Sequence, residues 1–418
     1  MVTVAKEMQR QGFTIPLMIG GATTSKAHTA VKIDPHYNEA VVYVSDASRA
    51  VGVASNLLSS EHKPGYMATI REEYEQVRIR QSKRVLKGAS CDYAEARSRK
   101  LKLDFVAQPP VAPKQLGVQA FANYSLEELV EFVDWTPFFI SWNLVGKYPA
   151  IFEDKVVGEE AKKLFADAKA MLKQIVSKQQ IEARGVIGLW PANSVDDDVI
   201  EVYADETRQV VIKKLTQLRQ QTPDKQGFCK SLADFIAPKD SGIPDWIGGF
   251  AVTSGIGVDE LAKAYEAELD DYSAIMLKAL ADRLAEAFAE CLHQRVRKEF
   301  WGYVKDEQLD NNALIKEAYQ GIRPAPGYPA CPDHTEKEGL FELLNATEHT
   351  SLILTESFAM YPTAAVSGWY FAHPDSKYFN LGKITRDQVE SAAEHKGMAA
   401  DTLERWLMPA LSYDPDQT

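Results

Sequence analysis

One segment of this chain combines residue types suited to holding a charged small molecule: residues 323–334 read RPAPGYPACPDH, with prolines at 324, 326, 329 and 332. Because proline fixes φ and lacks an N–H, this spacing excludes a helix and predicts an extended, polyproline-like course with unpaired carbonyls. Those carbonyls can accept hydrogen bonds from an adenine amino group or an ammonium. Arg323 can clamp a carboxylate, Gly327 admits a ligand close to the main chain, and the Tyr328 ring can face a cation. A rigid proline-rich surface loop is the alternative.

Two acidic residues are further candidates. Glu286 lies midway along a predicted helix beside small alanines, where its carboxylate can reach into a cleft. The alternatives are a solvated helix face and an i,i−3 pair with Arg283. Asp134 precedes Trp135 and is either a binding group or the cap of a helix or turn. No histidine pairs with Ser or Cys in a recognisable nucleophile motif, so hydrolase chemistry has little support.

The elements that must position these residues lie in an α+β region from residue 126 onward. Apolar runs at 185–192 and 199–204 flank the acidic turn 196–198, which predicts an antiparallel hairpin. Residues 258–297 predict one long helix with apolar residues four apart along one face. Further predicted elements are strands at 352–360 and 366–372 and helices at 385–396 and 401–411, with Gly397 as the cap between them.

The first 60 residues alternate between strand and helix instead. Residues 15–19 and 41–44 predict buried strands, and a helix follows each of them, at 23–31 and 48–58. This pattern is typical of a doubly wound α/β domain. Such a sheet needs more strands than these, so we expect the chain to begin inside that domain.

A basic stretch separates the two regions. Between Arg78 and Lys102 the chain carries nine Lys or Arg residues and two acids, and the proline-rich run 108–113 follows. Because prolines hinder regular pairing, this stretch predicts a solvated interdomain linker. Nucleic-acid binding is disfavoured, since aromatic residues are sparse there and the whole chain has a formal charge of −12.

Other classes of site have little support. The longest apolar runs are too short to span a bilayer and no signal peptide begins the chain, so we expect a cytoplasmic protein with no membrane partner. The four cysteines lie far apart, which argues against a disulfide framework or a zinc site. The acidic turn 196–198 could bind a divalent cation, but a solvated hairpin turn is the preferred interpretation.

Together these motifs resemble the C-terminal part of the cobalamin-dependent methionine synthase family. Residues 323–329 are similar to the family's S-adenosylmethionine-binding loop, and the similarity covers nearly the whole chain. The other matching motifs are DWTPFF at 134–139, GKYP at 146–149, TESFAM at 355–360 and SGWY at 367–370. The resemblance implies the end of a cobalamin-binding α/β domain at 1–75, a linker at 76–115 and an S-adenosylmethionine-binding activation domain at 116–418. That domain should contain a long antiparallel sheet flanked by helices.

The resemblance also implies the site residues. Glu286 would be an acidic partner of S-adenosylmethionine, and six residues would border it: Asp134, Arg323, Ala325, Tyr328, Tyr378 and Phe379. The family often has a tyrosine where Phe379 stands. Cobalamin would meet the ends of the two N-terminal strands at Gly20, Gly21 and Ala47, although plain strand-to-helix turns are the alternative. His36 imitates the family's cobalt ligand, but Glu39 replaces the glycine of that signature, so we expect no metal ligand here.

In this family, cobalamin carries a methyl group from methyltetrahydrofolate to homocysteine and is occasionally oxidised. The resemblance implies that the chain supports the repair, in which flavodoxin or a similar flavoprotein supplies an electron and S-adenosylmethionine supplies a methyl group. The folate, homocysteine, zinc and cobalt-ligand elements would belong to upstream domains of methionine synthase, which are then partners of this chain. The alternative is a non-catalytic module that senses S-adenosylmethionine or docks a flavoprotein.

Overall fold

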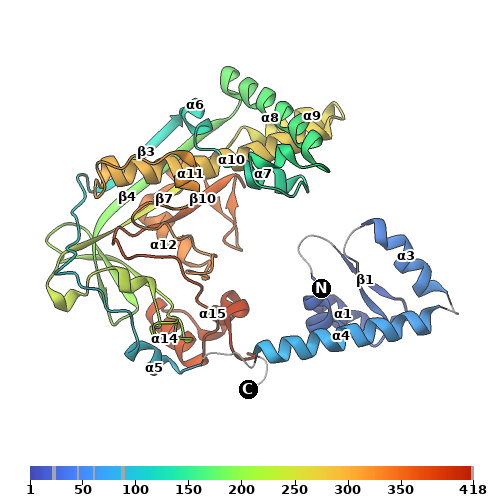
Figure 1. Ribbon diagram of the computed structural model, residues 1–418. Coiled ribbons are helices and arrows are strands. Elements are labelled where there is room, and N and C mark those ends of the chain that lie inside the picture. Colours follow the sequence, from blue (N-terminus) through green and yellow to red (C-terminus); the bar gives the residue numbers. More distant parts are fainter. Residues whose placement is uncertain (21–24, 45–46, 60–61, 86–89, 416–418) are drawn as a thin grey trace. The chain divides into compact units, whose positions relative to one another are not determined.

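The computed structural model describes residues 1–20, 25–44, 47–59, 62–85 and 90–415. The chain forms two compact units, Met1–Gly88 (unit 1) and Ala89–Thr418 (unit 2), which are described separately (Figure 1). Among the described residues, no helix combines the length and the apolar character that crossing a membrane requires.

Unit 1 contains a pair of parallel strands, as the sequence predicts. β1 (Leu17–Gly20) and β2 (Val41–Val44) pair in parallel, with Leu17 opposite Val41. Ile19 and Val41 are almost completely buried, because parallel strands are covered on both faces. The helices of this unit are α1 (Val2–Arg10), α2 (Lys26–His28), α3 (Ala47–Leu58) and α4 (Lys63–Val85).

The stretch predicted as a linker overlaps both units. Its first part is the end of α4, and the chain from Ala89 onward belongs to unit 2. There α5 (Tyr93–Ser98) begins at the cap Asp92, whose side chain accepts the N–H of Glu95 at 2.8 Å. Ala96 of this helix is fully buried, so apolar packing holds the segment where solvated chain was expected.

Unit 2 is built around a six-stranded antiparallel sheet, which confirms the predicted α+β class. The strands are β3 (Gly117–Tyr124), β4 (Glu182–Val195), β5 (Val199–Tyr203), β6 (Val211–Thr216), β7 (Asp245–Ile256) and β10 (Ala365–Tyr370). Their order is β10-β7-β4-β5-β6, and β3 also pairs with β4. β4 and β5 form the predicted hairpin. Its turn uses positive φ at Asp196 and Asp197, which aspartate tolerates better than most residues.

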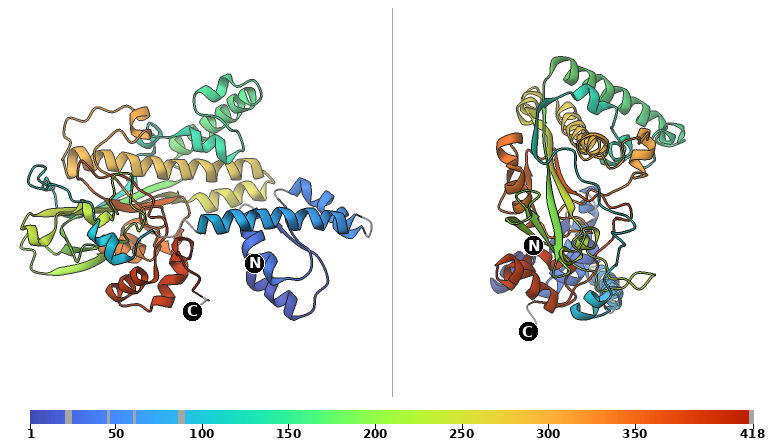
Figure 2. Two further views of the ribbon diagram at one scale, coloured as in Figure 1. Left: turned by 60° about the horizontal axis from the view of Figure 1, so that its bottom comes forward. Right: turned by 90° about the vertical axis from the view of Figure 1, so that its left-hand side faces the viewer.

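Helices cover both faces of this sheet, because successive residues of a strand point to opposite sides. On one face, Ile187 and Leu189 belong to the core beneath α10 (Asp271–Arg295). On the other face, Val186 and Trp190 belong to the core beneath α12 (Glu336–Leu344). Figure 2 shows the sheet between these helical layers.

The single helix predicted over 258–297 is two helices. α9 (Val258–Ala267) ends before Leu269, which takes a positive φ of 61°, and α10 begins after the cap Asp270. The Asp270 side chain accepts the N–H of Ser273 at 3.0 Å, which satisfies one free amide of the helix start. The predicted apolar face of α10 is confirmed, with buried Leu280, Leu284, Phe288 and Leu292.

The C-terminal part differs from prediction at one strand. Residues 352–360 form two short strands, β8 (Ile353–Leu354) and β9 (Met360–Tyr361), because a turn at Phe358, with a φ of 56°, separates them. The two last helices, α14 (Arg386–Lys396) and α15 (Ala400–Leu407), are confirmed, and Gly397 ends the first with a φ of 65°. The remaining helices are α6 (Leu126–Val130), α7 (Trp135–Ser141), α8 (Gly158–Lys178), α11 (Asn311–Ile315) and α13 (Ala346–Thr350).

Candidate functional site

The proline-rich segment begins as an extra strand beside β10. Ile322 and Phe371 exchange both backbone hydrogen bonds at 3.0 Å, and the Pro324 carbonyl accepts the N–H of Trp369 at 2.9 Å. Antiparallel pairing of alternate residues points the N–H and C=O of Arg323 away from β10. The Tyr378 hydroxyl accepts that N–H at 3.0 Å, whereas no donor among the described residues reaches the Arg323 carbonyl. Hydrogen bonding within the described residues therefore leaves this carbonyl unpaired.

Residues 325–331 form two consecutive turns instead of the predicted polyproline course. The Tyr328 N–H donates to the Ala325 carbonyl at 3.2 Å, and Gly327, which follows a proline, has a φ of 98°. Proline before glycine is typical of a type II turn, whose third residue needs a positive φ. The Cys331 N–H closes the second turn on the Tyr328 carbonyl at 2.9 Å. Several carbonyls predicted to be unpaired thus have partners, and the turns leave Tyr328 62% exposed.

Gly327 is expected to tolerate no side chain, because the His334 ring occupies the space predicted for a ligand. A methyl group there would lie 2.3 Å from His334 Cε1. The φ of 98° would also strain any residue other than glycine at this position. Gly327→Ala should lower the free energy of unfolding by about 2 kcal/mol, measured by urea denaturation. Gly382→Ala is the matched control, since its φ of 77° is also positive but a Cβ added there would meet no atom within 4 Å beyond its chain neighbours. Equal costs would show that the histidine ring simply moves aside.

Three residues predicted to bind the ligand meet at one groove of about 260 Å³. Asp134 caps α7, Glu286 lies on α10 and Arg323 belongs to the proline-rich segment, so the groove joins three distant parts of the sequence. Glu290, Glu317 and Arg283 also line it. Four carboxylates therefore face two arginines, and the potential of the groove favours a cation.

The Arg323 guanidinium is held from inside the protein. It pairs with Glu290 at 2.8 Å, donates to the Tyr319 hydroxyl at 2.8 Å and contacts His293 Nδ1 at 3.2 Å. Burial, aided by the neighbouring arginine charges, lowers the pKa of His293 well below its usual value, so the neutral ring accepts this hydrogen bond at Nδ1. Only 18% of the Arg323 side chain is exposed. The Arg323 guanidinium, predicted to bind a ligand carboxylate, thus binds the carboxylate of Glu290 instead.

Sequence reasoning missed Glu290 and Glu317. Glu290 follows Glu286 by four residues on α10, so the helical period places both on one face and is a signal that could have found it. Its side chain is buried, with one oxygen on Arg323 and the other 3.9 Å from Arg297. Glu317 follows α11 with a positive φ of 54°, and burial raises the pKa of its carboxyl. No spacing in the sequence connects Glu317 with the groove.

Asp134 and Glu286 keep carboxylate oxygens available to a ligand. One oxygen of Asp134 accepts the Thr136 N–H at 2.9 Å, which confirms the capping alternative. Its second oxygen has no partner among the described residues. Glu286 is exposed, and within the described part of the chain it forms no ion pair with Arg283. Asp134 therefore caps α7 with one oxygen and keeps the other for a cation in the groove. Glu286 lines the same groove with its carboxylate unpaired in the part of the chain that the structure describes.

None of the three predicted aromatic residues lines the groove itself, although Tyr378 contacts the groove residue Arg323. Tyr378 holds the main chain of the loop through its hydroxyl. Tyr328 lines a different pocket together with Gly327 and His334, and burial and the charge of Glu286 raise the pKa of its hydroxyl. Phe379 packs toward Phe235 in the core on the α12 side of the sheet, with ring centres 6.5 Å apart.

The residues predicted to meet cobalamin are in unit 1. Gly20 ends β1, and a Cβ there would lie 3.2 Å from the Val44 carbonyl of β2, so the two strand ends are closely packed. Gly21 lies outside the described residues, as does the side chain of Ala47 at the start of α3. His36 belongs to a short helical turn that precedes β2.

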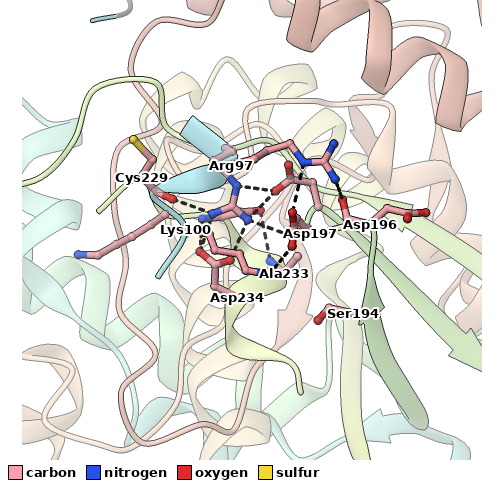
Figure 3. A network of polar contacts seen from close by, with 12 residues as sticks. Arg97, Lys100, Ser194, Asp196, Asp197, Cys229, Ala233 and Asp234 are labelled. Atoms are coloured by element: carbon pink, nitrogen blue, oxygen red, sulfur yellow. Dashed lines mark hydrogen bonds and ion pairs between the residues drawn. The ribbon is translucent and has the colours of Figure 1, made fainter. Parts of the chain in front are cut away.

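The acidic turn 196–198 is the predicted hairpin turn but is only partly solvated, because Asp196 is exposed whereas Asp198 is buried. Asp197 pairs with Lys100 (Figure 3). Asp198 lies 2.7 Å from Arg219. The lysine and the arginine come from distant segments, which no local pattern reveals. Within the described ranges, no group of three His, Cys, Asp or Glu side chains is arranged to hold a metal ion.

Comparisons with known proteins assign this chain to a family. Residues 125–397 match the family model described as "Vitamin B12 dependent methionine synthase, activation domain". A solved structure described as "Crystal Structure of the MetH Reactivation Domain bound to AdoHcy" is 56% identical, with a TM-score of 0.76 over 78% of this chain and 99% of that chain. The matched range includes the three groove residues Asp134, Glu286 and Arg323. The chain therefore belongs to the activation-domain family of vitamin B12-dependent methionine synthase.

Proposed function

We propose that unit 2 binds S-adenosylmethionine in the acidic groove and presents its methyl group for the reactivation of methionine synthase. The observation that carries this proposal is the convergence of Asp134, Glu286 and Arg323 on one groove. S-adenosylmethionine carries a sulfonium and an ammonium, and a groove with more carboxylates than arginines suits these charges. The similar MetH reactivation domain is bound to AdoHcy, which is what the donor becomes after losing its methyl group.

The residues of this chain would act through position and charge. Methyl transfer from a sulfonium needs no general base, because the leaving group is already activated. The carboxylates of Asp134 and Glu286 would attract the cationic groups, the unpaired carbonyl of Arg323 would accept from the adenine amino group, and Tyr328 would face the sulfonium. Reduced cobalamin, delivered as a substrate by another part of methionine synthase, supplies the nucleophile. The groove must therefore leave the methyl group accessible from outside.

The reactivation role is tested by reconstitution. The chain is added to a cobalamin-loaded upstream fragment of methionine synthase, with S-adenosylmethionine and with flavodoxin or a similar flavoprotein as electron donor. We expect methylcobalamin, detected by its visible absorption, only when both the chain and S-adenosylmethionine are present. Binding of S-adenosylmethionine without methylcobalamin formation would leave a non-catalytic sensing or docking module, and the reactivation role would be withdrawn.

Glu286→Gln is expected to weaken S-adenosylmethionine binding about tenfold, because a charge-assisted contact contributes about 1.5 kcal/mol. The side chain is exposed, so the free energy of unfolding should change by less than about 0.5 kcal/mol. Titration calorimetry measures the affinity. Glu394→Gln removes an exposed carboxylate from α14, outside the groove, and should leave the affinity unchanged. Equal losses in both variants would assign the effect to the overall charge of the protein.

A further inference from the structure

Two cysteines from distant parts of unit 2 are in contact. The sulfur atoms of Cys91 and Cys229 lie 4.0 Å apart, although 138 positions separate the residues in the sequence. Both side chains are buried in a small cluster with Ala96, and both are free thiols. A disulfide has an S–S distance of about 2.05 Å, so an approach of about 2 Å would join these sulfurs.

Backbone hydrogen bonds hold both cysteines at this spacing. The Cys91 N–H donates to the Gln221 carbonyl at 3.2 Å, and the Gln221 side chain donates back to the Cys91 carbonyl at 3.0 Å. The Cys229 N–H donates to the Arg99 carbonyl at 2.9 Å, and the Cys229 carbonyl accepts from Arg219 at 2.7 Å. Proximity maintained in this way gives each thiol a high effective concentration at the other.

The pair lies at one end of a segment that is held by apolar packing at Ala96 and by polar contacts with the acidic turn. We call residues 90–103 the strap. Tyr93 donates to Asp198 at 2.7 Å, Arg97 donates to the Asp196 carbonyl at 2.8 Å, and Lys100 pairs with the same acidic turn (Figure 3). The strap follows the boundary between the two compact units. A covalent bond at Cys91 would therefore fasten the chain where it enters unit 2.

We propose that Cys91 and Cys229 form a reversible disulfide that fastens the strap when a low-molecular-weight disulfide such as oxidised glutathione accumulates. The Cys91 thiolate attacks one glutathione sulfur, which breaks the reagent's S–S bond, releases one glutathione thiolate and leaves a mixed disulfide. The Cys229 thiolate then attacks Cys91 Sγ and displaces the second glutathione. Two thiol protons leave the protein, and its two electrons reduce the reagent to two thiols.

Exposure decides which cysteine reacts first. Cys91 retains 8% exposure and Cys229 has none. Burial raises the pKa of both thiols, to about 12 for Cys229, so the thiolate fraction and the reaction rate should increase with pH. The bond is thus suited to sustained oxidation and would form slowly at neutral pH.

The full chain is incubated with excess oxidised glutathione at mildly alkaline pH without denaturant, and its intact mass and peptide map are then measured. We expect a mass lower by two hydrogen atoms and one cross-linked peptide containing Cys91 and Cys229. The melting temperature should rise by several degrees, because the bond closes a long loop and restricts the unfolded chain. A dithiol reductant should restore both the mass and the melting temperature.

Variants separate this pair from general thiol oxidation. Cys229→Ser should stop at a glutathione adduct on Cys91, whereas Cys91→Ser should leave Cys229 unmodified. Cys291→Ser removes another buried thiol and should cross-link like the wild type. The wild-type measurement decides the question even where a variant fails to fold. A wild-type chain that stops at the glutathione adduct, or that cross-links only in denaturant, would overturn the proposal.

Discussion

Arg323→Ala is expected to lower the free energy of unfolding by about 3 kcal/mol and to weaken S-adenosylmethionine binding about tenfold or more. The arginine neutralises buried Glu290 and donates to Tyr319, so alanine leaves that carboxylate without its closest partner. The binding loss has a second cause. The same side chain anchors the proline-rich segment beside the groove, and without the anchor this segment loses its fixed position. Urea denaturation measures stability, and titration calorimetry measures affinity.

A second substitution separates the two effects of Arg323→Ala. Glu290→Gln removes the buried charge, so the double variant should recover part of the lost stability but none of the lost affinity. If Arg323→Ala leaves stability unchanged, then Arg297, which lies 3.9 Å from Glu290, neutralises the carboxylate by itself. An unchanged affinity would remove Arg323 from the binding site.

Arg219→Met is expected to lower the free energy of unfolding by about 4 kcal/mol, because it leaves two carboxylates unpaired in the interior. The arginine side chain has no exposed surface, and its guanidinium lies 2.7 Å from Asp198 and 2.8 Å from Asp234. Burial already raises the pKa of Asp234 despite this partner. Methionine retains the apolar stem, so the loss would come from the charge. Urea denaturation at several pH values measures it.

The pH dependence of Arg219→Met has a definite sign. Without the arginine, the folded-state pKa of Asp234, which burial already raises, should lie further above the unfolded value of about 4. The folded variant then binds more protons than the unfolded chain, so its stability falls as pH rises above about 4. The deficit relative to wild type should therefore shrink toward pH 4. Arg97→Met is the control, because its half-buried pair with Asp197 should contribute less than about 1 kcal/mol. Equal deficits in the two variants would contradict this account.

Features with local causes could be predicted from the sequence. The β4–β5 hairpin follows from two apolar runs around one turn, and the end of α14 follows from Gly397, which supplies a positive φ at little cost. The break between α9 and α10 was missed because Leu269 is not a usual helix-ending residue. Its positive φ is unfavourable in isolation, and the capping by Asp270 and the packing of both helices must offset that cost.

Local spacing in the sequence determined the antiparallel hairpin, and the resemblance of its motifs to a known family implied the class of ligand and the three residues that line the groove. Only the tertiary structure decided what those residues contact. Arg323 pairs with Glu290 because α10 crosses over the sheet, and Asp198 pairs with Arg219 because β6 lies beside β5. Buried charges must find a partner, and the partner depends on which elements pack together.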